Sequence, residues 1–104
     1  MGFGNMQQMM KQAQKMQRDM QRVQEELKVR TVEGTAGGGS VKIAMTCGFT
    51  VQDVQIQPEA IDSEDPGFLA ELVRQAMQNV LDLAQQVTET EMSKVTGGMR
   101  LPGM

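Results

Sequence analysis

Residues 41–57 constrain the fold more than any other part of the chain, because they follow the two-residue period of a β-strand. The first run has one apolar face, made by alternate residues: Val41, Ile43, Met45 and Cys47. Gly48 breaks this run, and residues 49–57 predict another strand that ends at Pro58, which has no backbone N–H to donate. The alternation slips within that strand, which predicts a β-bulge near residues 52–53.

A shorter strand is predicted upstream, over Arg30–Glu33. The six residues that follow, GTAGGG at 34–39, contain four glycines and predict a turn rather than a strand. The three strands predict a small antiparallel sheet with one apolar face. Such a sheet is not stable alone, so helices on either side in the sequence are expected to cover it.

The first helix is predicted from about Asn5, a plausible N-cap, to Lys28, with no glycine or proline between them. Its apolar residues recur at alternating intervals of three and four, the heptad spacing of a helix–helix contact. They form an apolar seam: Met6, Met9, Ala13, Met16, Met20, Val23 and Leu27. A helix of this length extends beyond a three-stranded sheet, so the seam is expected to require a partner helix.

The second long helix follows an acidic loop at residues 62–65, which is itself preceded by a short helical turn at 58–61. Asp65 followed by Pro66 predicts its start, and the helix is expected to run to about Lys94 and stop at the glycines that follow Thr96. Its wide apolar band predicts contacts with both the sheet and another helix. The sequence therefore predicts one α+β domain over residues 1–104, with loose tails at 1–4 and 97–104.

Charge is unevenly distributed along the chain. Residues 1–24 contain four cations and one anion, whereas residues 25–104 contain six cations and twelve anions. The four cations of the first helix are spaced four, three and four residues apart and share the face opposite the seam: Lys11, Lys15, Arg18 and Arg22. This stripe has two interpretations, a solvated helix face or a surface that contacts a phosphate backbone.

The composition argues against catalysis and metal chemistry. The chain has no histidine to transfer protons at neutral pH. Its single cysteine, Cys47, lies on the apolar face of a predicted strand and is interpreted as a small buried hydrophobe. The glycines at 37–39 join two strands, so they lack the helix that follows a phosphate-binding loop. A soluble cytosolic protein is expected, neither an enzyme nor membrane-bound, with no cofactor, metal or small-molecule substrate.

The order of these parts closely resembles the YbaB/EbfC family of small bacterial nucleoid-associated proteins. The resemblance covers essentially the whole chain and depends on an ordered set of segments. These are MKQAQKMQRDMQRVQEEL at 10–27, VEGTAGGGSVKI at 32–43, the turn at Cys47–Gly48, VQIQPE at 54–59 and GGMRLPGM at 97–104. Cys47 and Gln57 depart from the family pattern, which often has Asn and Asp at these two positions.

The resemblance implies a homodimer that forms through the sheet and adjacent helices, with projecting helices that bind double-stranded DNA in the nucleoid. It implies that the cations of the first helix contact DNA, with Lys94 and Arg100 as further candidates. A second hypothesis remains from the residues themselves: a dimeric protein-interaction module that uses the methionine-rich seam. Salt distinguishes the two, because phosphate contacts weaken steeply with salt.

Overall fold

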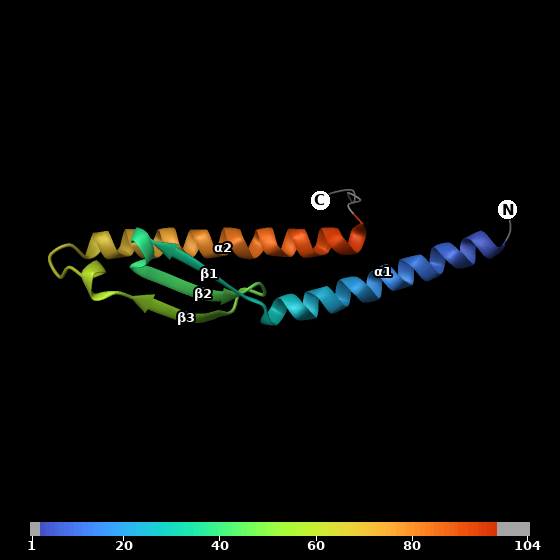
Figure 1. The fold of residues 1–104 in the computed structure, drawn as a ribbon, viewed down its shortest axis with the longest axis horizontal. Coiled ribbons are helices and arrows are strands. Elements are labelled where there is room, and N and C mark those ends of the chain that lie inside the picture. The colour runs from blue at the N-terminus through green and yellow to red at the C-terminus, as the bar shows by residue number, and fades with distance from the viewer. Residues whose placement is uncertain (1–2, 98–104) are drawn as a thin grey trace.

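The computed structural model describes residues 3–97, which form an elongated α+β protomer (Figure 1). The chain runs through α1 (Phe3–Val29), β1 (Thr31–Ala36), a short 3₁₀ turn η1 (Gly37–Gly39), β2 (Val41–Thr46), β3 (Val51–Ile56), a second 3₁₀ turn η2 (Pro58–Ala60) and α2 (Pro66–Thr96). The strands form one antiparallel sheet in the order β1-β2-β3. The predicted fold class is confirmed. Neither helix of residues 3–97 combines the length and hydropathy that a membrane span requires.

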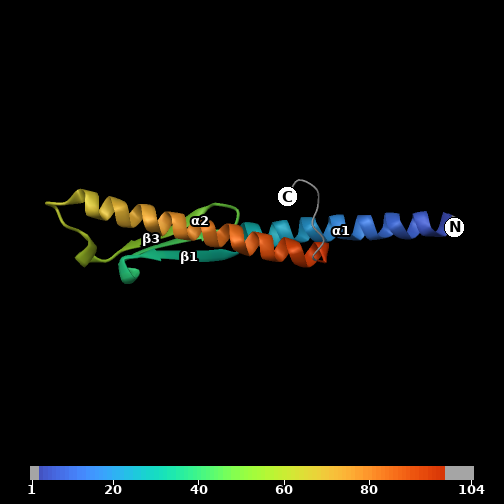
Figure 2. The ribbon, with the colours of Figure 1, turned by 90° about the horizontal axis from the view of Figure 1, so that it is seen from above.

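The protomer is far from spherical. It measures 75 × 22 × 16 Å, and its radius of gyration is 20.2 Å, whereas a compact domain of this length has a radius of about 13 Å. The excess length comes from α1, whose N-terminal half extends past the end of α2 (Figures 1 and 2). Every residue from 4 to 15 is exposed. We call residues 3–15 the arm.

The core lies between α2 and the first two strands. Alternate residues of β2, Val41, Ile43 and Met45, are buried against one face of α2. That face is formed by residues four apart, Leu72, Ala76, Val80 and Ala84. Cys47 is also buried, as predicted. The second half of α2 packs against the C-terminal half of α1 (Figure 1), so the wide apolar band contacts both a sheet and a helix, as expected.

The third strand is not covered, which contradicts the expectation that flanking helices cover the whole sheet. All six residues of β3 are exposed, including Val51, Val54 and Ile56. Val54 lies directly opposite buried Ile43, so it belongs to the face that carries α2. A helix about 10 Å in diameter spans two strands that are about 4.8 Å apart, and not a third. The protomer therefore has an uncovered apolar surface beside α2.

Several predicted boundaries are corrected by the structure. α1 begins at Phe3, so Asn5 lies inside the helix and does not cap it, and residues 3–4 are not a loose tail. β1 continues through Gly34 to Ala36, so only the three glycines of η1 form the predicted turn. Phe49 has a φ of 69° and belongs to the turn before β3.

Other local predictions are confirmed. The Phe68 backbone N–H donates to the Asp65 carboxylate at 3.2 Å, which makes Asp65 the N-cap of α2. Met45 pairs with Val51 while Ala44 pairs with Asp53, so Gln52 is the extra residue of the predicted bulge. α2 ends at Thr96 and is capped by Gly97, whose left-handed φ of 65° suits glycine. Residues 1–2 and the rest of the predicted C-terminal tail lie outside the described residues.

Gly34 belongs to a strand because α2 approaches it closely. A Cβ atom at this position would lie 2.4 Å from the Val80 backbone nitrogen and 2.7 Å from the Ala76 carbonyl oxygen. We expect Gly34→Ala to lower the free energy of unfolding by about 2 kcal/mol, because helix and strand must separate to admit one methyl group. Urea denaturation measures this loss.

A matched change is available in α1, where no atom lies within 4 Å of a Cβ built on Gly4. Gly4→Ala should leave the free energy of unfolding unchanged or raise it slightly, because alanine has a higher helix propensity than glycine at an exposed position. Equal effects of the two substitutions would show that the close approach of α2 to Gly34 is unimportant for stability.

Candidate nucleic-acid interface

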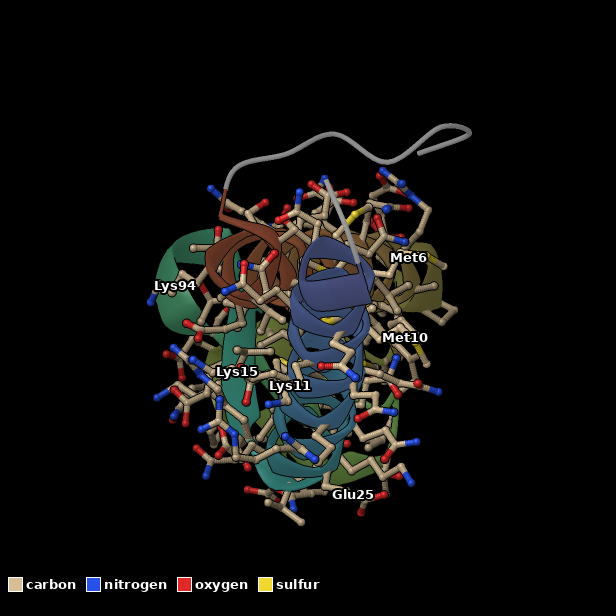
Figure 3. All side chains as sticks on the ribbon, turned by 90° about the vertical axis from the view of Figure 1, so that its right-hand side faces the viewer. Met6, Met10, Lys11, Lys15, Glu25 and Lys94 are labelled. Carbon is tan, nitrogen blue, oxygen red and sulfur yellow. The ribbon has the colours of Figure 1, made fainter. Side chains whose placement is uncertain are left out.

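The four cations of the predicted stripe are all exposed on α1. Viewed along the molecule from the arm end, Lys11 and Lys15 point away from Met6 and Met10 (Figure 3). This separation follows from the helical spacing, since residues three or four apart share a face. The arm therefore presents a cationic face and an apolar face on opposite sides of one helix.

Three of these cations have no acidic partner. Within residues 3–97, every lysine and arginine except Lys11, Lys15 and Arg18 lies within 4.0 Å of a carboxylate. Arg22 is the member of the stripe that is paired, at 3.7 Å from Asp19. The unpaired positive charge of the described residues is thus concentrated on one face of α1, in the arm and just beyond it.

Lys94 lies on the same side of the molecule as Lys11 and Lys15 (Figure 3). Its ammonium group donates to Glu91 at 3.1 Å, so it is not a free cation. This ion pair is largely exposed, and such pairs contribute little, which leaves Lys94 able to exchange its partner. Arg100, the other predicted contact, lies outside the described residues.

One charged residue that the sequence does not single out, Arg30, lies at the junction of α1 and β1. Its guanidinium donates to Glu91 on α2 at 3.2 Å. Hydrogen bonds from Lys94 and, more weakly, from Arg30 hold the pKa of Glu91 below its usual value. Arg30 therefore ties the end of α1 to α2. The partners are 61 residues apart, and no periodicity in the sequence indicates the contact.

The seam changes character along α1. Val23 and Leu27 are buried in the core, and Met16 and Met20 are half-buried. Met9 is 68% exposed, and Met6 and Ala13 are exposed as well. The seam therefore extends beyond its own sheet, as the length of the helix predicts, and its N-terminal part, from Met6 to Ala13, meets no partner among residues 3–97.

Within the part of the chain that the structure describes, no three acidic or cysteine side chains come together to hold a metal ion. What the arrangement offers chemically is positive charge on a long, exposed helix. Such a surface suits a polyanion, whose phosphates lie at regular intervals along a rod.

Comparisons with known proteins support DNA as the partner. The model of the YbaB/EbfC DNA-binding family matches residues 1–99. A nucleoid-associated protein of Pelotomaculum thermopropionicum is 46% identical over 101 residues, which cover 97% of this chain and 96% of that protein. A nucleoid-associated protein of Moorella thermoacetica is 47% identical over 103 residues, which cover 99% of each.

Among solved structures, an uncharacterized protein from Helicobacter pylori has the same fold, with a TM-score of 0.70. The match covers 93% of this chain and 99% of that one at 16% identity, so it concerns the fold alone. The family match extends over nearly the whole chain and includes both the arm and the sheet. The chain therefore belongs to the YbaB/EbfC DNA-binding family.

Proposed function

We propose that this protein is a nucleoid-associated protein that binds double-stranded DNA as a homodimer, through the cationic face of α1. The observation that carries this proposal is the set of three unpaired cations, Lys11, Lys15 and Arg18, on one side of a helix that extends from the body. The names of the relatives agree with it. Its biological role would be nucleoid organisation and gene regulation.

Two surfaces of the protomer support the homodimer. β3 presents Val51, Val54 and Ile56 beside α2, and its outer edge pairs with no other strand of residues 3–97. The seam presents Met6 and Met9 on the arm. A second copy is the occupant we propose for both, because each surface continues the protomer's own core. In a twofold dimer the same apolar surface of the partner would cover what α2 leaves open.

The mode of DNA contact follows from the residue types. The ammonium groups of lysine and the guanidinium groups of arginine on one helix face bind phosphates. Phosphate contacts position a protein on DNA without recognising the base sequence. Glutamines lie between these cations and can also donate to the backbone. We therefore propose binding that depends little on base sequence.

Salt dependence tests this mode directly. Four cations on each α1 give eight in a dimer, and a duplex engages about half of them at once. Counterion release then gives a slope of log affinity against log salt near −4, at about −0.9 for each phosphate neutralised. Fluorescence anisotropy on two unrelated duplexes at several salt concentrations measures it, and the two slopes should agree.

A protein-interaction module is the second candidate function, and the exposed methionines of the arm are the observation that favours it. Methionine is flexible and suits adaptable binding surfaces. An apolar interface of this kind responds weakly to salt. The absence of DNA binding at low salt, in a folded dimer, would replace the first proposal with this one.

A further inference from the structure

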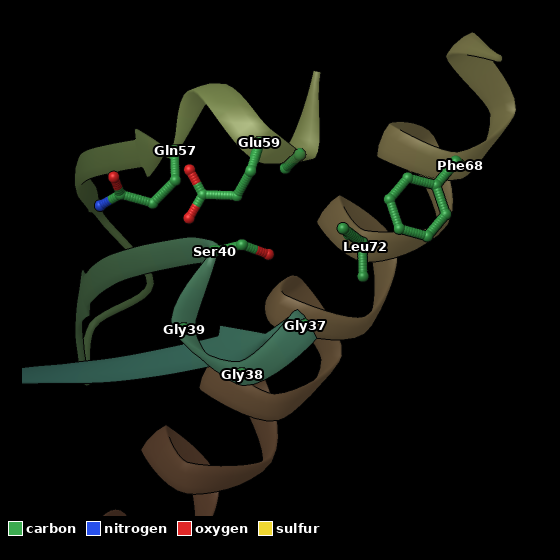
Figure 4. Close-up of a pocket in the computed structure, with 9 residues that line it drawn as sticks. Gly37, Gly38, Gly39, Ser40, Gln57, Glu59, Phe68 and Leu72 are labelled. Atoms are coloured by element: carbon green, nitrogen blue, oxygen red, sulfur yellow. The ribbon is translucent and has the colours of Figure 1, made fainter. Parts of the chain in front are cut away.

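A pocket of about 320 Å³ is formed where the β1–β2 turn meets the start of α2 (Figure 4). This part of the fold lies at the end of the molecule opposite the arm (Figure 1). This volume lies at the lower end of the range found for pockets that bind small ligands. The glycines of η1 form one wall, and the side chains that matter for its chemistry are Ser40, Gln57, Glu59, Phe68 and Leu72.

Local sequence explains why this space is unfilled. Gly37, Gly38 and Gly39 all have positive φ values, a conformation that favours glycine, so the turn has no side chains to place in the pocket. A Cβ atom on Gly37 would lie 2.5 Å from the Ser40 hydroxyl oxygen. Pro58 then ends β3 and begins η2, which places Glu59 at the rim.

The pocket favours a cation over an anion. Glu59 contributes a carboxylate, and none of the ion pairs within residues 3–97 includes it. The surrounding segment, residues 53–70, has no lysine or arginine and contains five acidic residues, whereas Glu71 beyond it is paired with Arg74. A phosphate would meet this negative field without a compensating charge, whereas a positively charged group would be attracted.

The remaining walls favour a planar cation. Phe68 is 50% exposed, and its ring stands across the pocket from Gln57 and Glu59 (Figure 4). A guanidinium group stacks on an aromatic ring and at the same time donates several hydrogen bonds in its own plane. The Glu59 carboxylate and the Gln57 carbonyl would accept them. An ammonium group has no plane to stack.

We propose that this pocket binds the arginine side chain of a polypeptide, held by Glu59 and stacked on Phe68. The arginine comes either from another copy of this protein or from a different protein. The inference is independent of the proposed DNA binding, because the pocket and the unpaired cations lie at opposite ends of the molecule.

The test is an NMR titration of the isotopically labelled full-length protein with acetyl-Gly-Arg-Gly-amide. We expect this peptide to change the chemical shifts of the backbone amides of residues 37–40. The same peptide with lysine in place of arginine should cause weaker changes, and the one with glutamine should cause none. Glu59→Gln should weaken binding of the arginine peptide by about tenfold or more, because it removes a charged hydrogen-bond acceptor.

Glu64→Gln is the matched control, since it removes the same charge from the neighbouring acidic loop without altering the pocket wall. Equal weakening by the two substitutions would overturn the proposal, as would equal binding of the arginine and glutamine peptides. Phe68→Leu should reduce the preference for arginine over lysine. DNA affinity, measured in parallel, should be the same for Glu59→Gln and the parent.

Sedimentation velocity at low salt identifies the source of the arginine once peptide binding is established. Larger assemblies in the parent than in Glu59→Gln would assign it to a second copy. Identical sedimentation of the two proteins would assign it to another polypeptide. Failure of the arginine peptide to shift the residues of the β1–β2 turn at millimolar concentration would refute the site itself, whatever the DNA measurements show.

Discussion

Replacing Lys11, Lys15 and Arg18 together by glutamine should lower the affinity for double-stranded DNA by about a hundredfold or more at about 0.1 M salt. At that concentration, counterion release contributes close to tenfold for each phosphate contact, and the triple substitution removes at least two contacts from each complex. The slope of log affinity against log salt should flatten as well. Fluorescence anisotropy measures both quantities.

The chain offers a control with the same change in net charge. Lys28, Lys42 and Arg74 are each paired with a carboxylate in the protomer, and replacing all three by glutamine should leave most of the affinity intact. Circular dichroism should show both variants folded, since exposed cations contribute little to stability. Equal losses in the two variants would mean that binding follows net charge and not the face of α1.

Replacing Val54 by lysine should convert the proposed homodimer into a monomer or unfold it. In the protomer Val54 is 48% exposed, so the substitution alone is tolerated there. In the proposed dimer the same side chain is buried against a second copy, and an unpaired buried ammonium group costs several kcal/mol by order of magnitude. Sedimentation equilibrium and thermal denaturation at micromolar concentration report the two outcomes.

Gln55→Lys is the matched control on the neighbouring residue. Gln55 lies opposite Lys42 on the other face of the sheet, which carries no helix, so a lysine there remains in water and the dimer should persist. If the two variants sediment alike as dimers, the interface does not use the apolar face of β3. The exposed end of the seam, at Met6, Met9 and Ala13, would then become the candidate interface.

The sequence correctly predicts the features of the fold that depend on neighbouring residues. The heptad spacing predicted α1, the alternation from Val41 predicted β2, and the slip of that alternation located the bulge at Gln52. Asp65 followed by Pro66 predicted the start of α2. Each of these signals follows from the geometry of one helix or strand, which the local sequence encodes directly.

Gly34 and Arg30 show which features the local sequence does not predict. A glycine in GTAGGG indicates a turn by its own preferences, yet Gly34 is a strand residue because α2 leaves no room for a Cβ atom beside it. Arg30 lies beyond the predicted helix, and its partner Glu91 is distant in the sequence. In both cases an atom of α2 determines the structure: the Val80 backbone nitrogen beside Gly34, and the Glu91 carboxylate oxygen that accepts from Arg30.

By itself, the sequence determined the helices, the strands, the separation of cations from the seam, and the excess of cations near the N-terminus. Only the tertiary structure decided that Lys11, Lys15 and Arg18 stay free, because among residues 3–97 the fold brings no carboxylate within 4.0 Å of them, whereas the pairing of Arg22 with Asp19 follows from a spacing of three residues in one helix. It also decided that β3 stays uncovered, since one helix has the width of two strands. Local patterns fix the faces of each element, and packing in three dimensions decides which faces remain open for a partner.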